Sequence, residues 1–112
     1  MGKTFIIAEA GDNHNGILDN AMRLVDKAVL AGADCVKFQT FITEEVISKF
    51  AEKADYQKNA TGSSESQYQM VKKLELSFSD FIQIQNYCKD KKIMFLSTPF
   101  DIPSIRFLQS ID

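Results

Sequence analysis

The chain has 112 residues, 45% hydrophobic and 25% charged, with a formal net charge of −2. This composition is that of an ordinary soluble globular domain, or of a piece of a larger one. The near-neutral charge argues against binding to nucleic acid or to an acidic membrane surface. No apolar run approaches the roughly 20 residues that span a bilayer, and the N-terminus lacks the apolar region of a signal peptide. The two cysteines, Cys35 and Cys88, do not form a disulfide or metal pattern. We therefore expect free thiols in a cytoplasmic protein.

The first predicted element is an apolar strand at residues 4–8, which runs directly into Glu9 and a small polar loop. The loop contains His14, the only histidine of the chain. Burying an unpaired carboxylate is costly, so a strand that ends on Glu9 indicates a partner or a task for that charge. Apolar residues at helical spacing then predict a helix over 18–29. We expect Asp12, Asn13 or Asn15 to cap its start and Gly32 to form a left-handed cap at its end.

The same layout occurs twice more along the chain. A strand at 34–38 carries Lys37 and ends on Gln39, and a strand at 93–97 ends on Thr98. A polar, irregular segment at 40–75 follows the second strand, with a short helix expected at 67–74. Its polar residues would form either a lid or a solvated loop: Tyr56, Gln57, Thr61, Ser66 and Gln67.

Two further helices complete the predicted order. Ser77 and Asp80 have the spacing of a capping box, which predicts a helix from there onward. Asp101 is placed to cap a last short helix with Pro103 in its first turn. Strands that alternate with helices in this way form parallel sheets with right-handed crossovers.

Three parallel strands with polar residues at their C-terminal ends are typical of the mouth of a TIM (β/α)8 barrel. Residues 1–112 would supply about the first three βα units of such a barrel domain, because a fourth strand is expected where the chain stops. Since side chains alternate along a strand, one face of the sheet would carry the candidate site residues into the barrel. These are Glu9, Lys37, Gln39 and Thr98.

Each candidate has a functional and a structural interpretation. Lys37 can hold a phosphate or carboxylate as a point charge, can act as a Schiff-base nucleophile, or can form a structural ion pair with Glu9. Glu9 can serve as a base, as a metal ligand or as the ion-pair partner of Lys37. His14 can bind substrate or water, or can brace the loop. Asn13 is expected to be a turn former.

Three ordered motifs resemble the N-acetylneuraminate (sialic acid) synthase family. They are IIAEAGDNHNG at 6–16, AGADCVKFQT at 31–40 and FLSTPFD at 95–101. The resemblance covers essentially the whole chain. It implies a (β/α)8 barrel followed by a small antifreeze-protein-like domain in a homodimer. The later barrel strands and that second domain are not in this sequence.

The implied reaction condenses phosphoenolpyruvate with N-acetylmannosamine, or a related N-acetylated amino sugar, to give a nonulosonic acid and phosphate. It depends on a divalent metal, manganese or magnesium, whose ligands would lie outside this chain. By motif, Lys37 and Thr98 should contact phosphoenolpyruvate, Gln39 the sugar, and Glu9 the region of the reacting carbons. Asn13 and His14 would shape the loop beside the site, where Asp12 replaces a residue that is usually apolar in relatives.

Two rival functions stay open at this point. One is a Schiff-base aldolase that uses Lys37. The other is a non-catalytic barrel fragment that binds a sugar phosphate or a partner chain. The related 3-deoxy-sugar-acid phosphate synthases share the condensation chemistry, but their acceptor sugars carry a phosphate.

Overall fold

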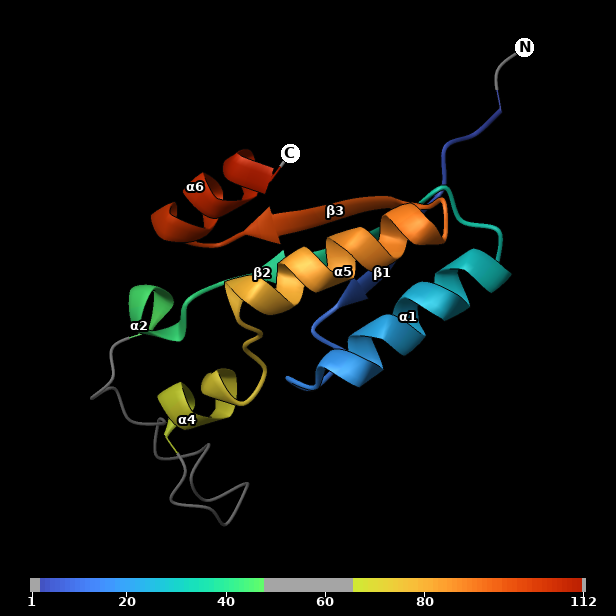
Figure 1. Cartoon of the computed structure of the whole chain (residues 1–112). Coiled ribbons are helices and arrows are strands. Elements are labelled where there is room, and N and C mark those ends of the chain that lie inside the picture. The colour runs from blue at the N-terminus through green and yellow to red at the C-terminus, as the bar shows by residue number, and fades with distance from the viewer. Residues whose placement is uncertain (1–2, 48–65, 112) are drawn as a thin grey trace.

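A computed structural model describes residues 3–47 and 66–111 of the chain. Three parallel strands form one sheet in the order β1-β2-β3, and helices follow the strands along the chain (Figure 1). None of the helices in the described ranges is long and apolar enough to cross a membrane. The elements are β1 (Ile7–Gly11), α1 (Leu18–Leu30), β2 (Cys35–Thr40), α2 (Thr43–Val46), α4 (Gln67–Lys72), α5 (Phe78–Asp90), β3 (Met94–Pro99) and α6 (Ile102–Ile111).

The predicted α/β architecture is confirmed, but each strand lies further along the chain than expected. The shift is largest for β1, which was predicted at 4–8 and spans Ile7–Gly11. The reason is that Glu9 lies inside the strand, where it forms an ion pair with Lys37 on the neighbouring strand. A charged residue therefore did not mark the end of the strand, because its partner lies on the neighbouring one.

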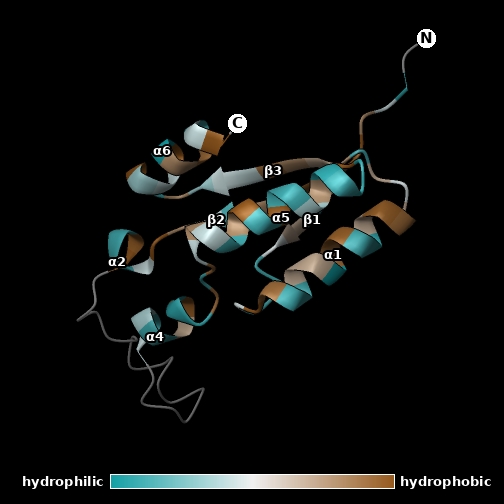
Figure 2. Cartoon of the chain, in the orientation of Figure 1, coloured by the Kyte–Doolittle hydropathy of each residue, from teal (hydrophilic) through white to brown (hydrophobic). Residues whose placement is uncertain are grey.

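The hydrophobic core lies between the sheet and the helices α1 and α5, which contact each other. Figure 2 shows hydrophobic and hydrophilic residues interleaved along both helices, as expected where one side packs on a sheet and the other meets water. The core is closed by fully buried side chains from β2 and the two helices: Val25, Val36, Phe38, Phe81 and Ile84. Cys35 and Cys88 are also fully buried and are free thiols.

The opposite face of the sheet carries apolar side chains that remain accessible. Ile7 is 46% exposed, Met94 51% and Leu96 40%. These residues alternate with the core-facing ones, and Glu9 and Lys37 belong to the same face by register. In a closed barrel this face would point inward.

The helix caps only partly follow the predictions. The capping box of Ser77 and Asp80 is confirmed, and so is the left-handed Gly32, with φ of +82°. The expected side-chain cap of α1 is wrong: its N-cap residue is Ile17, and no side chain caps it. Asn15 and Gly16 adopt φ values of 57° and 75°. This turn separates the polar residues of the loop from the N-cap position at Ile17.

Residues 40–47 and 66–75 contain two short helices, of which α2 was not predicted. They are held together by polar contacts across the segment. Glu75 accepts hydrogen bonds from the backbone N–H and the hydroxyl of Thr43, at 2.8 and 2.7 Å. Tyr68 donates to Glu44, and Lys72 lies 3.1 Å from the same carboxylate. Ser66 caps α4. Tyr56, Gln57 and Thr61 of the proposed lid lie outside the described residues.

The first βα loop packs tightly against the segment between α4 and α5. A Cβ atom at Gly16 would lie only 2.0 Å from the carbonyl oxygen of Lys73, so no other residue fits without moving the backbone. The positive φ of Gly16 adds conformational strain for any L side chain. This glycine therefore lets the loop that follows β1 meet the segment that precedes α5.

We predict that Gly16→Ala lowers the free energy of unfolding by about 2 kcal/mol or more, because strain and a backbone clash act together. Gly32→Ala is the matched control. Its φ is also positive, but nothing lies within 4 Å of the added Cβ, so only the conformational cost of about 1 kcal/mol applies. Urea denaturation of the three proteins measures the difference. Equal losses for both variants would contradict the close approach at Gly16.

Candidate functional site

The register of the sheet brings the four predicted site residues to one region. Glu9 on β1 is paired with Lys37 on β2, and Gln39 on β2 is paired with Thr98 on β3. Lys37 and Gln39 are two residues apart on one strand, so they share a face and lie about 7 Å apart along it. The side chains therefore gather near the C-terminal ends of the three strands.

Glu9 and Lys37 form an ion pair with 3.1 Å between Oε1 and Nζ. The Lys37 side chain is 36% exposed and that of Glu9 51%. An ion pair with this much access to water contributes little to stability. Both charges remain accessible to a ligand. The observed ion pair is therefore compatible with the structural interpretation of Lys37 and with the functional one.

Gly11 provides space at the end of β1. The register of β1 against β2 is irregular between Glu9 and Gly11, and Gly11 has φ of +55°. A Cβ atom at this position would lie 3.4 Å from Oε2 of Glu9 and 3.6 Å from Nε2 of Gln39. The Glu9 carboxylate and the Gln39 amide thus both border the position that a Cβ atom of residue 11 would occupy. Because residue 11 is glycine, this position is open.

His14 and Asn13 shape the loop. The ring of His14 is fully buried, its Nδ1 accepts a hydrogen bond of 2.9 Å from the N–H of Gly16, and it lies beside the ring of Phe38. Burial lowers the pKa of His14, which favours the neutral imidazole. Asn13 is exposed, and its N–H closes a turn onto Ala10. The Nδ1 contact braces the loop, whereas Nε2 is buried without a hydrogen-bond partner among the described residues, so both interpretations of His14 stay open.

Asp12 was expected to cap a helix and was noted as a departure from an apolar residue in relatives, but it was not among the predicted site residues. Its Oδ1 is buried and has no hydrogen-bond partner among the described residues. Burial raises the pKa of the Asp12 carboxyl, and the nearby charge of Glu9 raises it further. The only signal in the sequence was an acidic residue placed directly after a strand, and that signal fits a cap equally well.

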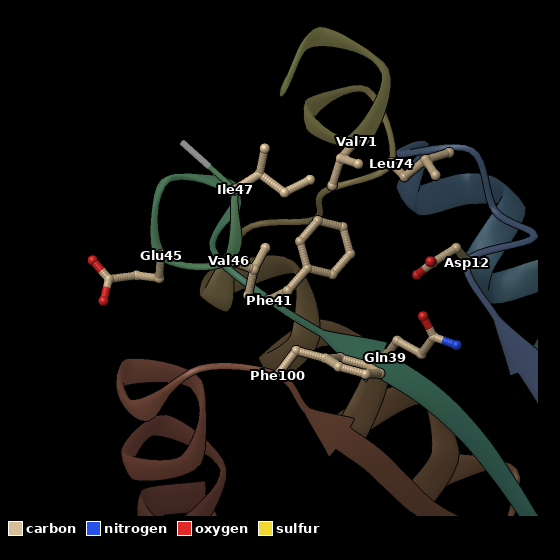
Figure 3. A pocket seen from close by; sticks show the side chains of 9 residues that line it. All are labelled: Asp12, Gln39, Phe41, Glu45, Val46, Ile47, Val71, Leu74 and Phe100. Atoms are coloured by element: carbon tan, nitrogen blue, oxygen red, sulfur yellow. The ribbon is translucent and has the colours of Figure 1, made fainter. Parts of the chain in front are cut away.

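Asp12 and Gln39 both line an open cavity of about 590 Å³ (Figure 3). The figure shows the two polar side chains on one side of the cavity, beside the aromatic ring of Phe41, whereas the carboxylate of Glu45 points away. The remaining lining is apolar and comes from three separate segments: Phe41, Val46, Ile47, Val71, Leu74 and Phe100. No local sequence pattern pointed to this cavity, because its walls meet only in the folded chain.

Hydrogen bonds at the strand ends hold these segments in place. Oγ1 of Thr40 and Oγ of Ser97 are 2.6 Å apart, and the N–H of Phe100 donates to the carbonyl of Thr40. Asp101 accepts from Ile42 through one carboxylate oxygen and from the third residue of α6 through the other, each at 2.7 Å. The predicted cap of α6 is confirmed, and the same carboxylate also joins two loops.

The described residues do not fit a metal ion. No group of three or more His, Cys, Asp or Glu side chains in 3–47 and 66–111 is arranged to hold one.

Residues 24–112 match the model of the NeuB family. The chain belongs to the NeuB family. It is 49% identical over 99% of its length to the N,N'-diacetyllegionaminic acid synthase of Campylobacter jejuni, and it covers 33% of that protein. It is 50% identical over 96% of its length to the enzyme of the same name from Legionella pneumophila, of which it covers 30%. The chain thus spans about a third of the length of these NeuB-family relatives.

A solved structure supports the same assignment. The N-acetylneuraminic acid synthetase of Leptospira borgpetersenii superposes with a TM-score of 0.74 at 34% identity, over 98% of this chain and 34% of the other. The three parallel βα units therefore correspond to the N-terminal part of a NeuB-family TIM barrel, as the sequence predicted.

We predict that Glu9→Gln lowers the pKa of Asp12, because the substitution removes a nearby negative charge while leaving Asp12 as buried as before. Since burial is the larger cause, the pKa should stay above its ordinary value. Carboxyl carbon chemical shifts followed against pH measure the effect. Asp19→Asn, at an exposed acid on α1, is the control and should leave the Asp12 titration unchanged. An unaltered Asp12 pKa in Glu9→Gln would show that the two carboxylates do not interact.

Proposed function

We propose that residues 1–112 form the first three βα units of a NeuB-family synthase. The enzyme condenses phosphoenolpyruvate with an N-acetylated amino sugar to give a sialic-acid-type nonulosonic acid and phosphate. The observation that carries this proposal is the cluster of Glu9, Lys37 and Gln39, which places a cation, an anion and an amide together at the C-terminal edge of a parallel sheet. Membership of the NeuB family gives the class of reaction.

In the proposed reaction the enol carbon of phosphoenolpyruvate attacks the aldehyde carbon of the open-chain sugar. Water then adds to the resulting cationic carbon, and phosphate leaves as the C–O bond breaks. Lys37 binds an anionic group of phosphoenolpyruvate, and the Thr98 hydroxyl donates to it from the next strand. Gln39 binds the sugar. Glu9 lies near the reacting carbons, where its carboxylate orders water or accepts a proton.

The acceptor we favour carries two acetylated nitrogens. Both relatives near 50% identity are named for an N,N'-diacetylated product, whereas the structural relative named for N-acetylneuraminic acid is 34% identical. N-acetylmannosamine is the single-acetyl alternative.

The metal and the assembly belong to the same proposal. Manganese or magnesium would need ligands from outside the described residues, so no step above is routed through it. A homodimer and a cytoplasmic location are likewise proposed on the family's behaviour alone.

The direct experiment is an assay of the complete reading frame that carries this chain. Phosphoenolpyruvate is supplied with mono- and di-N-acetylated hexoses, with and without manganese, and phosphate release is followed. Release that requires an N-acetylated acceptor supports the proposal, and release only with a phosphorylated sugar would favour the 3-deoxy-sugar-acid phosphate synthases. No release with any acceptor would favour the non-catalytic alternative.

We predict that Lys37→Ala raises the KM for phosphoenolpyruvate roughly 10- to 100-fold, because a charge-assisted contact is lost. Lys91→Ala is the control, since that surface lysine lies near Asp26 on α1 and away from the strand ends. Steady-state kinetics at saturating sugar measure both variants. An unchanged KM would remove Lys37 from the donor site, and a pyruvate adduct trapped on Lys37 by borohydride would favour the aldolase alternative.

We predict that Gln39→Ala raises the KM for the sugar roughly tenfold and changes the KM for phosphoenolpyruvate little, because a neutral amide contact to the acceptor is lost. Gln85→Ala serves as control, since that side chain bonds the backbone of Ile111 in α6. The two KM values are measured separately. A selective loss of affinity for phosphoenolpyruvate would show that the two roles are exchanged.

A further inference from the structure

We propose that His14 is a positioning residue, whose neutral imidazole holds the first βα loop in the conformation that completes the cavity beside Gln39. Protonation of the ring releases the loop, so this part of the site at the C-terminal edge of the sheet is assembled only above a threshold pH. The loop contact goes beyond the proposed function and does not depend on it, whereas its effect on turnover rests on that function.

His14 joins three parts of the fold. Its carbonyl accepts two hydrogen bonds of 3.2 Å, from the side chain of Asn20 on α1 and from the backbone N–H of Ile17. Its fully buried ring lies beside Phe38 of β2, with 6.3 Å between the ring centroids. Its Nδ1 accepts a hydrogen bond of 2.9 Å from the N–H of Gly16. The side chain therefore holds the turn at Gly16 against the sheet and the start of α1.

The turn at Gly16 is the point where this loop meets the segment before α5. A Cβ atom at Gly16 would lie only 2.0 Å from the carbonyl oxygen of Lys73. Asp12, on the same loop, lines the cavity, and Val71 and Leu74 line it from α4 and the segment after it (Figure 3). The contact that His14 makes with Gly16 therefore keeps these walls of the cavity together.

The Nδ1 contact determines where the ring carries its hydrogen. An atom that accepts from an N–H offers a lone pair, so the hydrogen of the neutral imidazole is on Nε2. Nε2 is buried and has no hydrogen-bond partner among the described residues. Protonation adds a hydrogen at Nδ1, which then faces the N–H of Gly16 as donor against donor. In the closed loop the charged ring would thus lack an acceptor in 3–47 and 66–111 at either nitrogen.

The charged groups around the ring do not offset this cost. Glu9 and Lys37 pair with each other on the face of the sheet opposite to Phe38. Five other charged residues lie on the elements around the ring: Asp12 on its own loop, Asp19 on α1, Asp80 on α5, and Lys73 and Glu75 before α5. Burial, and not any of these charges, lowers the pKa of His14 from its ordinary value of 6.5.

The direction of the pH dependence follows from this shift. Because the closed loop lowers the pKa of His14, uptake of a proton favours the released loop, in which the ring regains contact with water. The loop contact is therefore at full strength above the ordinary pKa of 6.5 and weakens as the pH falls below it. In acid, Asp12 and Gly16 are expected to separate from the segment at Lys73.

Asparagine and leucine at position 14 form a matched pair for the test. The two side chains are nearly isosteric, and both are smaller than the imidazole. Only asparagine places an acceptor oxygen where Nδ1 lies, one bond beyond Cγ, and this oxygen does not take up a proton near neutral pH. His14→Asn should therefore keep the Gly16 contact at every pH, and His14→Leu should lose it at every pH. The wild type should change from the first behaviour to the second as the pH falls.

NMR titration of the protein from the complete reading frame measures the contact, with isotopic labels on glycine and on the histidine ring. In the wild type the ring should report the Nε2–H tautomer at neutral pH, and the Gly16 amide shift should move with the midpoint of the ring titration. The Gly16 amide should be protected from hydrogen exchange roughly tenfold more in His14→Asn than in His14→Leu. The wild-type titration needs no substitution, so it decides the result even if a variant does not fold. A Gly16 amide that is indifferent to the ring titration would overturn the positioning role, and so would equal protection in the two variants.

The pH profile of turnover supplies a readout that a merely structural residue would not move. Phosphate release gives kcat/KM for the acceptor sugar in the wild type and in His14→Asn across the acid range. The acid limb of the profile should lie roughly half a pH unit lower in His14→Asn, because the acceptor at position 14 no longer titrates. A limb that stays in place would overturn the link between the loop and the site.

The two measurements separate this proposal from the synthase proposal. A Gly16 amide that follows the ring titration, without any turnover, would reject the synthase function and leave the positioning role of His14 standing. Turnover with a Gly16 amide that ignores the ring titration would reject the positioning role and leave the synthase function standing.

Discussion

The register of β2 against its two neighbours determines where every candidate site residue lies. Glu9 meets Lys37, and Gln39 meets Thr98, only in this alignment. A slip of one residue would turn Lys37 and Gln39 toward the helices and bring Val36 and Phe38 to the other face. The buried side chains of Val36 and Phe38 oppose such a slip, because they complete the core with α1 and α5. The hydrophobic core thus fixes the polar site on the other side of the same strand.

The loops at the C-terminal edge are fixed by a second set of contacts, which are mostly polar. Asp101 joins the loop after β2 to the start of α6, and Glu75 joins α2 to the segment before α5. Gly16 allows the first loop to touch that segment directly. These contacts bring Asp12, Phe41 and Val71 around one cavity, although they are far apart in sequence. The cavity is therefore a product of loop packing, whereas the ion pair is a product of sheet register.

Sequence reasoning succeeded where a local pattern decides the structure. The capping box at Ser77 and the left-handed Gly32 depend on neighbouring residues alone, and both were predicted. Prediction was less accurate where a distant residue decides. The bounds of β1 were misplaced because Lys37 accommodates Glu9 within the sheet, and α2 was missed because its polar sequence is held by Glu75 from 30 or so residues away. The grouping of Glu9, Lys37, Gln39 and Thr98 followed from strand alternation, but the part played by Asp12 could not, because its environment is made by other segments.

The two buried thiols have a consequence for following the motions of this chain. Cys35 lies in the central strand and Cys88 in the helix that covers it, and both are fully inaccessible. Burial raises the pKa of Cys88 to about 12, so the reactive thiolate is scarce while the core is closed. Alkylation of Cys88 therefore requires the sheet and α5 to separate, and its rate reports how often they do. Cys35 lies by register on the opposite face of the sheet, with Lys37, so its alkylation rate reports a separate opening. The native sequence thus carries its own reporters of core opening, without any introduced label.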